Sequence, residues 1–142
     1  MPIRCEIVSQ DRSVFSGDVD IVILPGSDGV MGILPHHSLV LTTLHFGVIT
    51  VRRGKEEMMF TVAGGVAEVQ PDQVTVLADA AENVVEIDVQ RAEAARQRAE
   101  AMLKQIDRVD SDEYIKIQNT LRKSTLRLDA VRRYRRGQNR SI

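Results

Sequence analysis

The pattern of hydrophobic and polar positions changes abruptly near residue 85. Before this point, apolar residues alternate with polar ones or form short runs, and Gly, Pro and Asp interrupt them every ~8–12 residues, which is typical of an all-β sandwich or barrel. From Asp88 to about Arg136 there is no Gly and no Pro, and Ala, Arg, Glu, Gln and Leu dominate. That pattern predicts two antiparallel helices. We therefore expect an α+β chain, with an N-terminal antiparallel β-sandwich over residues 1–85 and a C-terminal antiparallel two-helix hairpin over residues 86–142.

The first part contains roughly nine or ten short runs that are typical of strands in a closed or sandwiched sheet. Turn signals separate them. Gly17 and Asp18 mark one bend, and residues 25–29, with the sequence PGSDG, form a dense turn cluster. Gly64 and Gly65 predict a two-residue hairpin turn, because a positive φ costs glycine little. The expected strands are residues 3–9, 14–16, 19–24, 30–34, 39–44, 48–52, 58–63, 66–70 and 74–78.

The second part has the spacing of a helical hairpin with a narrow seam. Asp88 is the expected N-cap of the first helix, and Asp110 with Glu113 has the spacing of a capping box before the second. Small and apolar residues recur at alternating steps of three and four, with Ser124 as a polar weak point. The expected seam residues are Ala92, Ala95, Ala99, Met102, Ile106, Val109, Tyr114, Ile117, Leu121, Ser124, Leu128 and Val131. We expect residues 132–142, which are basic and polar, to fray.

Charge is distributed unevenly between the two parts. Residues 1–88 contain 5 basic and 13 acidic side chains, and residues 89–142 contain 14 basic and 7 acidic ones. The net charges are therefore −8 and +7, which together give the −1 of the whole chain. This asymmetry indicates an acidic or anionic partner for the basic part, or attraction between the two parts.

The second helix is the most basic segment. Between Lys116 and Arg140 there are nine basic side chains and one acidic one, Asp129. This run is consistent with a solvated helix face, with binding to nucleic-acid phosphates, or with docking on an acidic protein surface or anionic ligand. Only Tyr114 and Tyr134 are available to stack on bases, which disfavours recognition of single strands.

No catalytic centre is predicted. Gly26, Gly29 and Gly32 lack the G-x-G-x-x-G spacing of a dinucleotide site, and the three histidines with one cysteine do not form a metal-ligand array. Cys5 lies in an apolar alternation and is expected in the core. The sequence shows no signal peptide and no apolar stretch of the ~18 residues that a membrane span needs. We expect a cytosolic chain, or a peripheral one on the cytosolic side of a membrane.

Several stretches, in order, resemble the epsilon subunit of bacterial F-type ATP synthases. They are FSGDV at residues 15–19, LPGSDGVMGILPHHSLVLTTL at 24–44, GVITV at 47–51, VAGGVAEVQPDQVTVLAD at 62–79 and IDVQRAEAARQRAE at 87–100. The resemblance spans nearly the whole chain. It implies a sandwich and hairpin, a non-catalytic rotor subunit that joins the gamma shaft to the membrane c-ring, and a peripheral position at the bacterial membrane.

The resemblance also implies two contact surfaces. The c-ring contact maps to the turn formed by Ser27, Asp28, Gly29, Val30 and Met31, where some relatives carry an acidic residue in place of Val30. The extended hairpin would run along gamma and inhibit ATP hydrolysis by docking on acidic segments of the alpha and beta subunits in the catalytic head. Its docking residues would be Arg122, Lys123, Arg127, Arg132 and Arg133. Such a partner disfavours nucleic-acid binding.

Some members of the family bind ATP on the folded hairpin as a sensor, through the motif [I/L]-D-x-x-R-A. Residues 87–92 match this motif. The implied ATP-binding residues are Glu82, Ile87, Asp88, Arg91, Ala92, Arg98, Lys123 and Arg127. Lys123 stands where strong binders have arginine, which removes a bidentate phosphate contact. The alternative is that Asp88 only caps the helix and the arginines are solvated. No cofactor is required, and ATP is expected only as a regulatory ligand.

Overall fold

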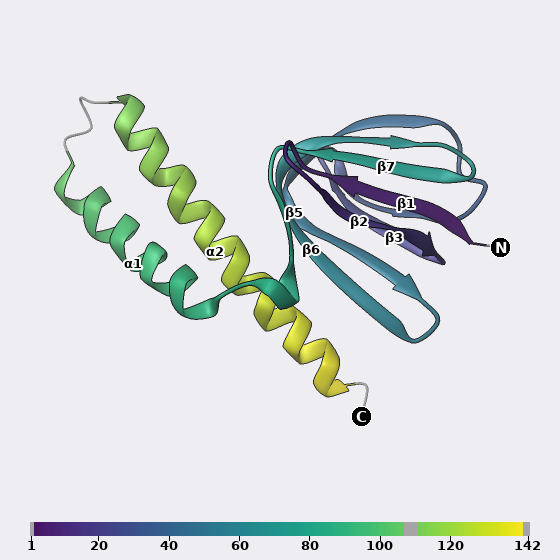
Figure 1. The fold of residues 1–142 in the computed structure, drawn as a ribbon. Helices are drawn as coiled ribbons and strands as arrows, with labels where there is room; N and C mark the ends of the chain where they lie inside the picture. Colours follow the sequence, from purple (N-terminus) through teal and green to yellow (C-terminus); the bar gives the residue numbers. More distant parts are fainter. Residues whose placement is uncertain (1, 107–110, 141–142) are drawn as a thin grey trace. The chain divides into compact units, whose positions relative to one another are not determined.

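The computed structural model describes residues 2–106 and 111–140, and the chain divides into two compact units (Figure 1). The first unit comprises Met1–Val84 and the second Val85–Ile142. Each unit is described by itself below.

The first unit is a sheet in which the described residues form eight strands. Their order is β2-β1-β7-β6-β5-β3-β4, and β8 pairs with β6. Contacts between β2, at one end of this order, and β5 show that the sheet folds over onto itself as a sandwich. Neighbouring strands are antiparallel, as expected, except that β1 and β7 are parallel. The strands are β1 Ile3–Val8, β2 Ser13–Val19, β3 Ile21–Gly26, β4 Gly29–Ile33, β5 Val40–Arg53, β6 Glu56–Val69, β7 Gln73–Ala78 and β8 Ala81–Asn83.

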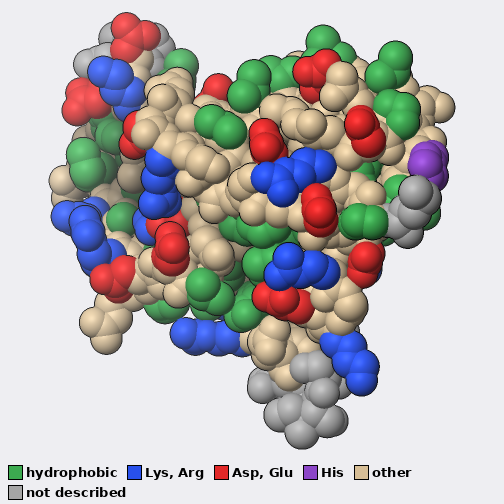
Figure 2. Space-filling model, turned by 45° about the vertical axis from the view of Figure 1, so that its right-hand side comes forward, with side chains coloured by type: hydrophobic (Ala, Val, Ile, Leu, Met, Phe, Trp, Pro, Cys, Tyr) green, Lys and Arg blue, Asp and Glu red, His purple; other side chains and the backbone are tan. Residues whose placement is uncertain are grey.

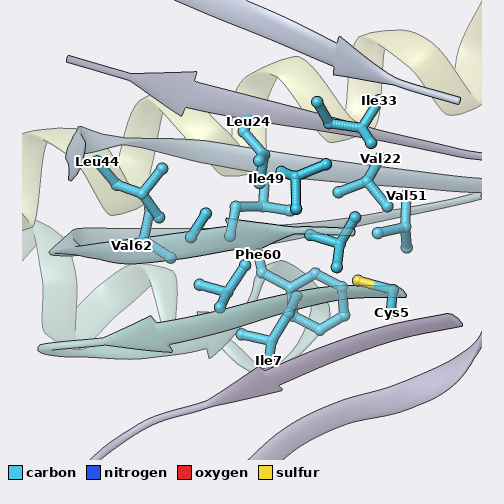
Figure 3. Packing of buried hydrophobic residues seen from close by; sticks show 14 of the residues in the cluster. Cys5, Ile7, Val22, Leu24, Ile33, Leu44, Ile49, Val51, Phe60 and Val62 are labelled. Atoms are coloured by element: carbon cyan, nitrogen blue, oxygen red, sulfur yellow. The ribbon is translucent and has the colours of Figure 1, made fainter. Parts of the chain in front are cut away.

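The core follows directly from the alternation of side chains along each strand. In β1, Ile3, Cys5 and Ile7 are fully buried because every second side chain points to the same face. Phe60 is also fully buried in this cluster (Figure 3). Its ring centroid lies 5.4 Å from that of Phe15. Burial, helped by the charge of Glu6, raises the pKa of the Cys5 thiol to about 12. The expected core position of Cys5 is therefore confirmed.

The two longest strands correct the strand boundaries expected from sequence. The runs at 39–44 and 48–52 form one strand, β5, and the predicted hairpin at Gly64 and Gly65 lies within the continuous strand β6. Both glycines do have positive φ, 90° and 138°. A Cβ on Gly65 would lie only 2.4 Å from the carbonyl oxygen of Leu77, so glycine is needed here for a close backbone approach to β7.

Another boundary is shifted at the start of the sheet. The predicted bend at Gly17 and Asp18 lies within β2, and the chain turns instead at Asp20, between β2 and β3. Gly17 pairs with Cys5 of β1 and Asp18 with Arg4. Pairing with β1 therefore overrides the local turn propensity of these two residues.

The second unit begins with a short 3₁₀ helix, Val84–Glu86, whose first residue belongs to the sheet unit, and continues into α1, Val89–Gln105, and α2, Ser111–Arg140. Asp88 caps α1 as expected: the Arg91 backbone N–H donates to Asp88 Oδ1 at 3.1 Å. The predicted fraying from residue 132 is wrong, because α2 continues through Gly137 to Arg140. The proposed capping residue Asp110 and the seam residue Val109 lie outside the described residues.

The two helices pack against each other, and six of the eleven described residues of the predicted seam are buried. Ser124 is 4% exposed, and its hydroxyl donates to the Thr120 carbonyl oxygen at 2.9 Å, so its polar group is satisfied. Met102 departs from the prediction with 48% exposure. The fully or nearly buried seam residues are Ala92, Ala99, Ile117, Ser124, Leu128 and Val131.

Candidate functional site

The turn expected to contact the c-ring joins β3 to β4 and is tied to β5. The Ser27 backbone N–H donates to the Thr43 carbonyl oxygen at 2.9 Å, and the two hydroxyls are 2.5 Å apart. His45 Nε2 lies 3.0 Å from the Ser27 carbonyl oxygen. These bonds hold the turn firmly on the sheet, so its exposed tip has a defined position.

The tip itself presents an unusual combination of side chains. Asp28 is exposed, Gly29 has a φ of 134°, and Val30 is 78% exposed. Met31, in contrast, packs partly buried against the core. Three of the five predicted contact residues are therefore exposed, and Ser27 and Met31, which are partly buried, anchor the turn.

Apolar side chains are also exposed elsewhere on the sheet, among acidic and basic ones (Figure 2). Strand register puts Val66 directly opposite Leu77 and opposite Thr43, so these side chains share one face. Leu41, two residues before Thr43, lies on the same face and is 75% exposed. Apolar side chains gathered on one exposed sheet face are typical of a protein-binding surface.

The predicted ATP motif is only partly accessible. Ile87 is 8% exposed and Ala92 is fully buried, while Arg91 is exposed. The Asp88 carboxylate is engaged as the helix cap. Glu82 lies in β8, in the first unit. At the defined positions of the motif, Asp88 and Arg91 present polar side chains, and Gln90, at a variable position, is also exposed.

Among the remaining predicted ATP residues, Arg98 lines a hollow between α1 and α2. It lines a cavity of about 300 Å³ together with Lys116 of α2, whereas Lys123 and Arg127 do not line it. Sequence reasoning missed Lys116. Its spacing of seven residues from Lys123, with Arg127 four further on, places all three on one stripe of α2 and could have indicated it.

An ion-pair network on α1 was also missed. Arg96 donates to Glu93, and through a second nitrogen to Glu100 at 2.7 Å. The hydrogen bond from Arg96 lowers the pKa of Glu93, and the positive charge of Arg132 on α2 contributes in the same direction. The same bond with Glu93 raises the pKa of Arg96. The i, i+3 and i, i+4 spacings of these residues were a sufficient sequence signal.

The predicted head-docking residues are distributed around α2. At about 100° per residue, Arg122 and Arg133 project in nearly the same direction, Lys123 and Arg127 in a second direction, and Arg132 in a third. Arg132 Nη1 lies 3.6 Å from Asp129 Oδ1, one turn earlier on α2. Near the end of α2 a basic hollow of about 600 Å³ is lined by Asp129, Arg132, Arg133, Arg135 and Arg136.

The described helices include none with the length and apolar character needed to cross a membrane. The chain combines a folded sheet unit with a charged helical hairpin.

Comparison with known proteins places this architecture in a family. Residues 2–84 match the family described as ATP synthase, Delta/Epsilon chain, beta-sandwich domain, and residues 86–132 match its long alpha-helix domain. The ATP synthase epsilon chain of Dehalococcoides mccartyi is 40% identical over 140 residues, which cover 94% of this chain and 95% of the relative. The ATP synthase epsilon chain of Syntrophobacter fumaroxidans is 45% identical over 126 residues, which cover 89% of this chain and 92% of the relative.

Solved structures agree on the fold. A chain in the cryo-EM structure of the Euglena gracilis mitochondrial ATP synthase, OSCP/F1/c-ring, superposes with a TM-score of 0.73 at 22% identity, covering 87% of this chain and 78% of that one. A chain in the cryo-EM structure of the Tetrahymena thermophila mitochondrial ATP synthase, central stalk and c-ring, superposes with a TM-score of 0.57 at 11% identity. The superposition covers 92% of this chain and 97% of that one.

The architecture and these relatives define a non-catalytic accessory subunit of ATP synthase. The chain belongs to the ATP synthase epsilon chain family. The resemblance inferred from sequence and the sandwich-plus-hairpin fold are both confirmed.

Proposed function

We propose that the chain is a central-stalk subunit of a proton- or sodium-driven bacterial F-type ATP synthase, that it couples the gamma shaft to the c-ring, and that its hairpin inhibits ATP hydrolysis. The observation that carries this proposal is the match of both family domains, in order, over residues 2–84 and 86–132. The complex would hold the chain peripherally on the cytoplasmic face of the cell membrane. No nucleic-acid partner is needed.

The sheet unit would supply the rotor contacts. The exposed apolar face with Leu41, Val66 and Leu77 is suited to a large protein partner, and gamma is the proposed one. The anchored turn at residues 27–31 would contact the c-ring. Because Val30 is exposed and uncharged, that contact would rest on shape and apolar burial more than on an ion pair at this position.

The hairpin would supply regulation. Arg122, Lys123, Arg127, Arg132 and Arg133 would meet acidic segments of the alpha and beta subunits when the hairpin extends. Because these cations project in several directions from α2, the proposed docking would surround the helix instead of using one face.

ATP would bind the folded hairpin, which would thereby act as a sensor of ATP. A ligand present at ten times its dissociation constant, and binding only one state, stabilises that state by about 1.4 kcal/mol. Control by ATP therefore requires that the free energies of the folded and extended hairpin differ by no more than ~1–2 kcal/mol. Arg91, whose backbone N–H bonds to the capping residue Asp88, is the cation of the motif, and it is exposed.

The rotor proposal is tested by adding the purified chain to a bacterial catalytic head that contains gamma but lacks epsilon. We expect the chain to co-elute with the head in gel filtration and to lower its ATP hydrolysis rate. A variant with Leu41→Glu and Leu77→Glu should lose co-elution, while Arg12→Glu, an exposed substitution in the loop between β1 and β2, should not. Absence of co-elution by the native chain would refute the role.

Inhibition is tested separately in the same assembly. The chain carrying Arg122→Gln, Lys123→Gln and Arg133→Gln should bind the head normally but relieve the inhibition severalfold. Unchanged inhibition by this variant would exclude these three side chains as the docking contacts while leaving the rotor role intact.

A further inference from the structure

The hairpin contains a hollow of about 300 Å³ between α1 and α2. Its floor is apolar, each helix contributes one cation to its rim, and none of its lining residues is acidic. It lies entirely within the helical unit. The lining residues are Ala95, Arg98, Ala99 and Met102 from α1, and Lys116, Ile117 and Thr120 from α2.

Small side chains line the hollow on α1. Ala95 and Ala99 each end at Cβ, and Met102 is 48% exposed where the spacing predicted a seam position. Ile117 and Ala99, at 7% and 2% exposure, close the bottom of the hollow, and the accessible apolar surface belongs to Met102 and the half-buried Ala95. An apolar group of a ligand would cover this surface with a gain in free energy.

The two rim cations are not neutralised within the described residues. Arg98 and Lys116 form no ion pair there, whereas Arg96, two positions before Arg98, lies between Glu93 and Glu100. Three other hollows of the hairpin each include at least one carboxylate, from Glu93, Glu100 or Asp129. The charge of this hollow therefore selects an anion.

We propose that this hollow binds a small amphipathic anion, in which an apolar chain or ring covers Ala95 and Met102 and a carboxylate lies between Arg98 and Lys116. A volume of about 300 Å³ accommodates about ten non-hydrogen atoms, at the ~30 Å³ that a water-sized group occupies. Arg98 also belongs to the expected ATP set, but Lys116, Met102 and Ile117 do not. The proposal depends neither on ATP binding nor on the rotor role.

The test uses octanoate, which has the required size and charge. The full chain, labelled with ¹⁵N, is titrated and followed by amide chemical shifts. We expect saturable shifts at residues 95–102 and 116–120, and binding of octanol, the neutral analogue, weaker by about fivefold, since a charge-assisted hydrogen bond is lost. Octanol binding as tightly as octanoate, or shifts confined to other residues, would overturn the proposal.

Variants identify the rim and the floor. Lys116→Gln should weaken octanoate about fivefold, and Ala95→Leu, which fills the hollow, should abolish binding. Lys104→Gln, an exposed lysine in the last turn of α1, is the matched control and should change nothing. Because Lys116 is exposed, the Lys116→Gln chain should keep a native spectrum, so equal affinity in that variant would count directly against the site.

An ATP titration separates this inference from the sensor proposal. Arg91→Ala should abolish any ATP binding but leave octanoate binding unchanged. If ATP shifts residues 95–102 and 116–120 while octanoate does not, the hollow is a phosphate site and the amphipathic-anion proposal fails.

Discussion

The backbone N–H of Arg91 donates to the carboxylate of Asp88 at 3.1 Å, so the acidic residue of the expected ATP motif is also the N-cap of α1. The Asp88 carboxylate therefore caps α1 without any bound ligand. The Ala92 backbone N–H adds the first helical bond, to the Asp88 carbonyl oxygen at 3.0 Å. Loss of ATP binding on mutating Asp88 would therefore have two possible causes, which the first prediction separates.

Replacement of Asp88 tests the cap. Asp88→Ala should destabilise the hairpin by about 1 kcal/mol, because the N–H of Arg91 loses its acceptor, while Asp88→Ser should restore most of the loss. The measurement is amide hydrogen exchange in α1. If ATP binds the native chain and Asp88→Ser as well, the carboxylate acts through capping. Unchanged exchange in Asp88→Ala would contradict the role of the observed bond.

Replacement of Gly65 tests the close approach between β6 and β7. Gly65→Ala should destabilise the sheet unit by about 2–3 kcal/mol, because its Cβ would lie 2.4 Å from the Leu77 oxygen at a φ of 138°. Gly54→Ala is the matched control: its φ is 61° and no atom lies within 4 Å of the added Cβ, so we expect about 1 kcal/mol. Both are measured by urea unfolding. Equal losses would refute the steric argument.

The pKa of Glu93 predicts a dependence of hairpin stability on pH. The hydrogen bond from Arg96 lowers this pKa below its ordinary value of 4.5. A depressed folded-state pKa contributes stability that is present above 4.5 and is lost as pH falls through the folded value. Helical circular dichroism during acid titration should therefore fall less steeply in Glu93→Gln. An NMR titration that finds Glu93 at or above its ordinary pKa would contradict this expectation.

Calorimetric titration of ATP into the purified chain tests the sensor. We expect saturable binding below ~1 mM, at which ten-fold excess would stabilise the folded hairpin by about 1.4 kcal/mol. Arg91→Ala and Arg127→Ala should each abolish the heat of ATP binding. Lys55→Ala, in the tip between β5 and β6 of the sheet unit, is the control and should leave that heat unchanged. The absence of binding at several millimolar would leave the rotor role intact and exclude ATP as the regulator.

The candidate surfaces were predictable to different degrees. Residues 27–31 lie in one short segment, so sequence alone placed them together, and the bonds from Ser27 to Thr43 only fixed their position. The ATP set was harder, because its members come from β8, α1 and α2. Lys116 beside Arg98 required the pairing of two helices, which periodicity predicts without giving the relative position of their residues.

Sequence by itself determined the two-part organisation, the alternation that buries Ile3, Cys5 and Ile7, and the Asp88 cap, since these depend on neighbours within a few residues along the chain. Tertiary structure decided what depends on distant segments. Gly64 and Gly65 have the positive φ of a turn, yet pairing with β5 on one side and β7 on the other keeps β6 continuous. Met102 has seam spacing, but it is half exposed and lines a hollow between two helices, which no local pattern encodes.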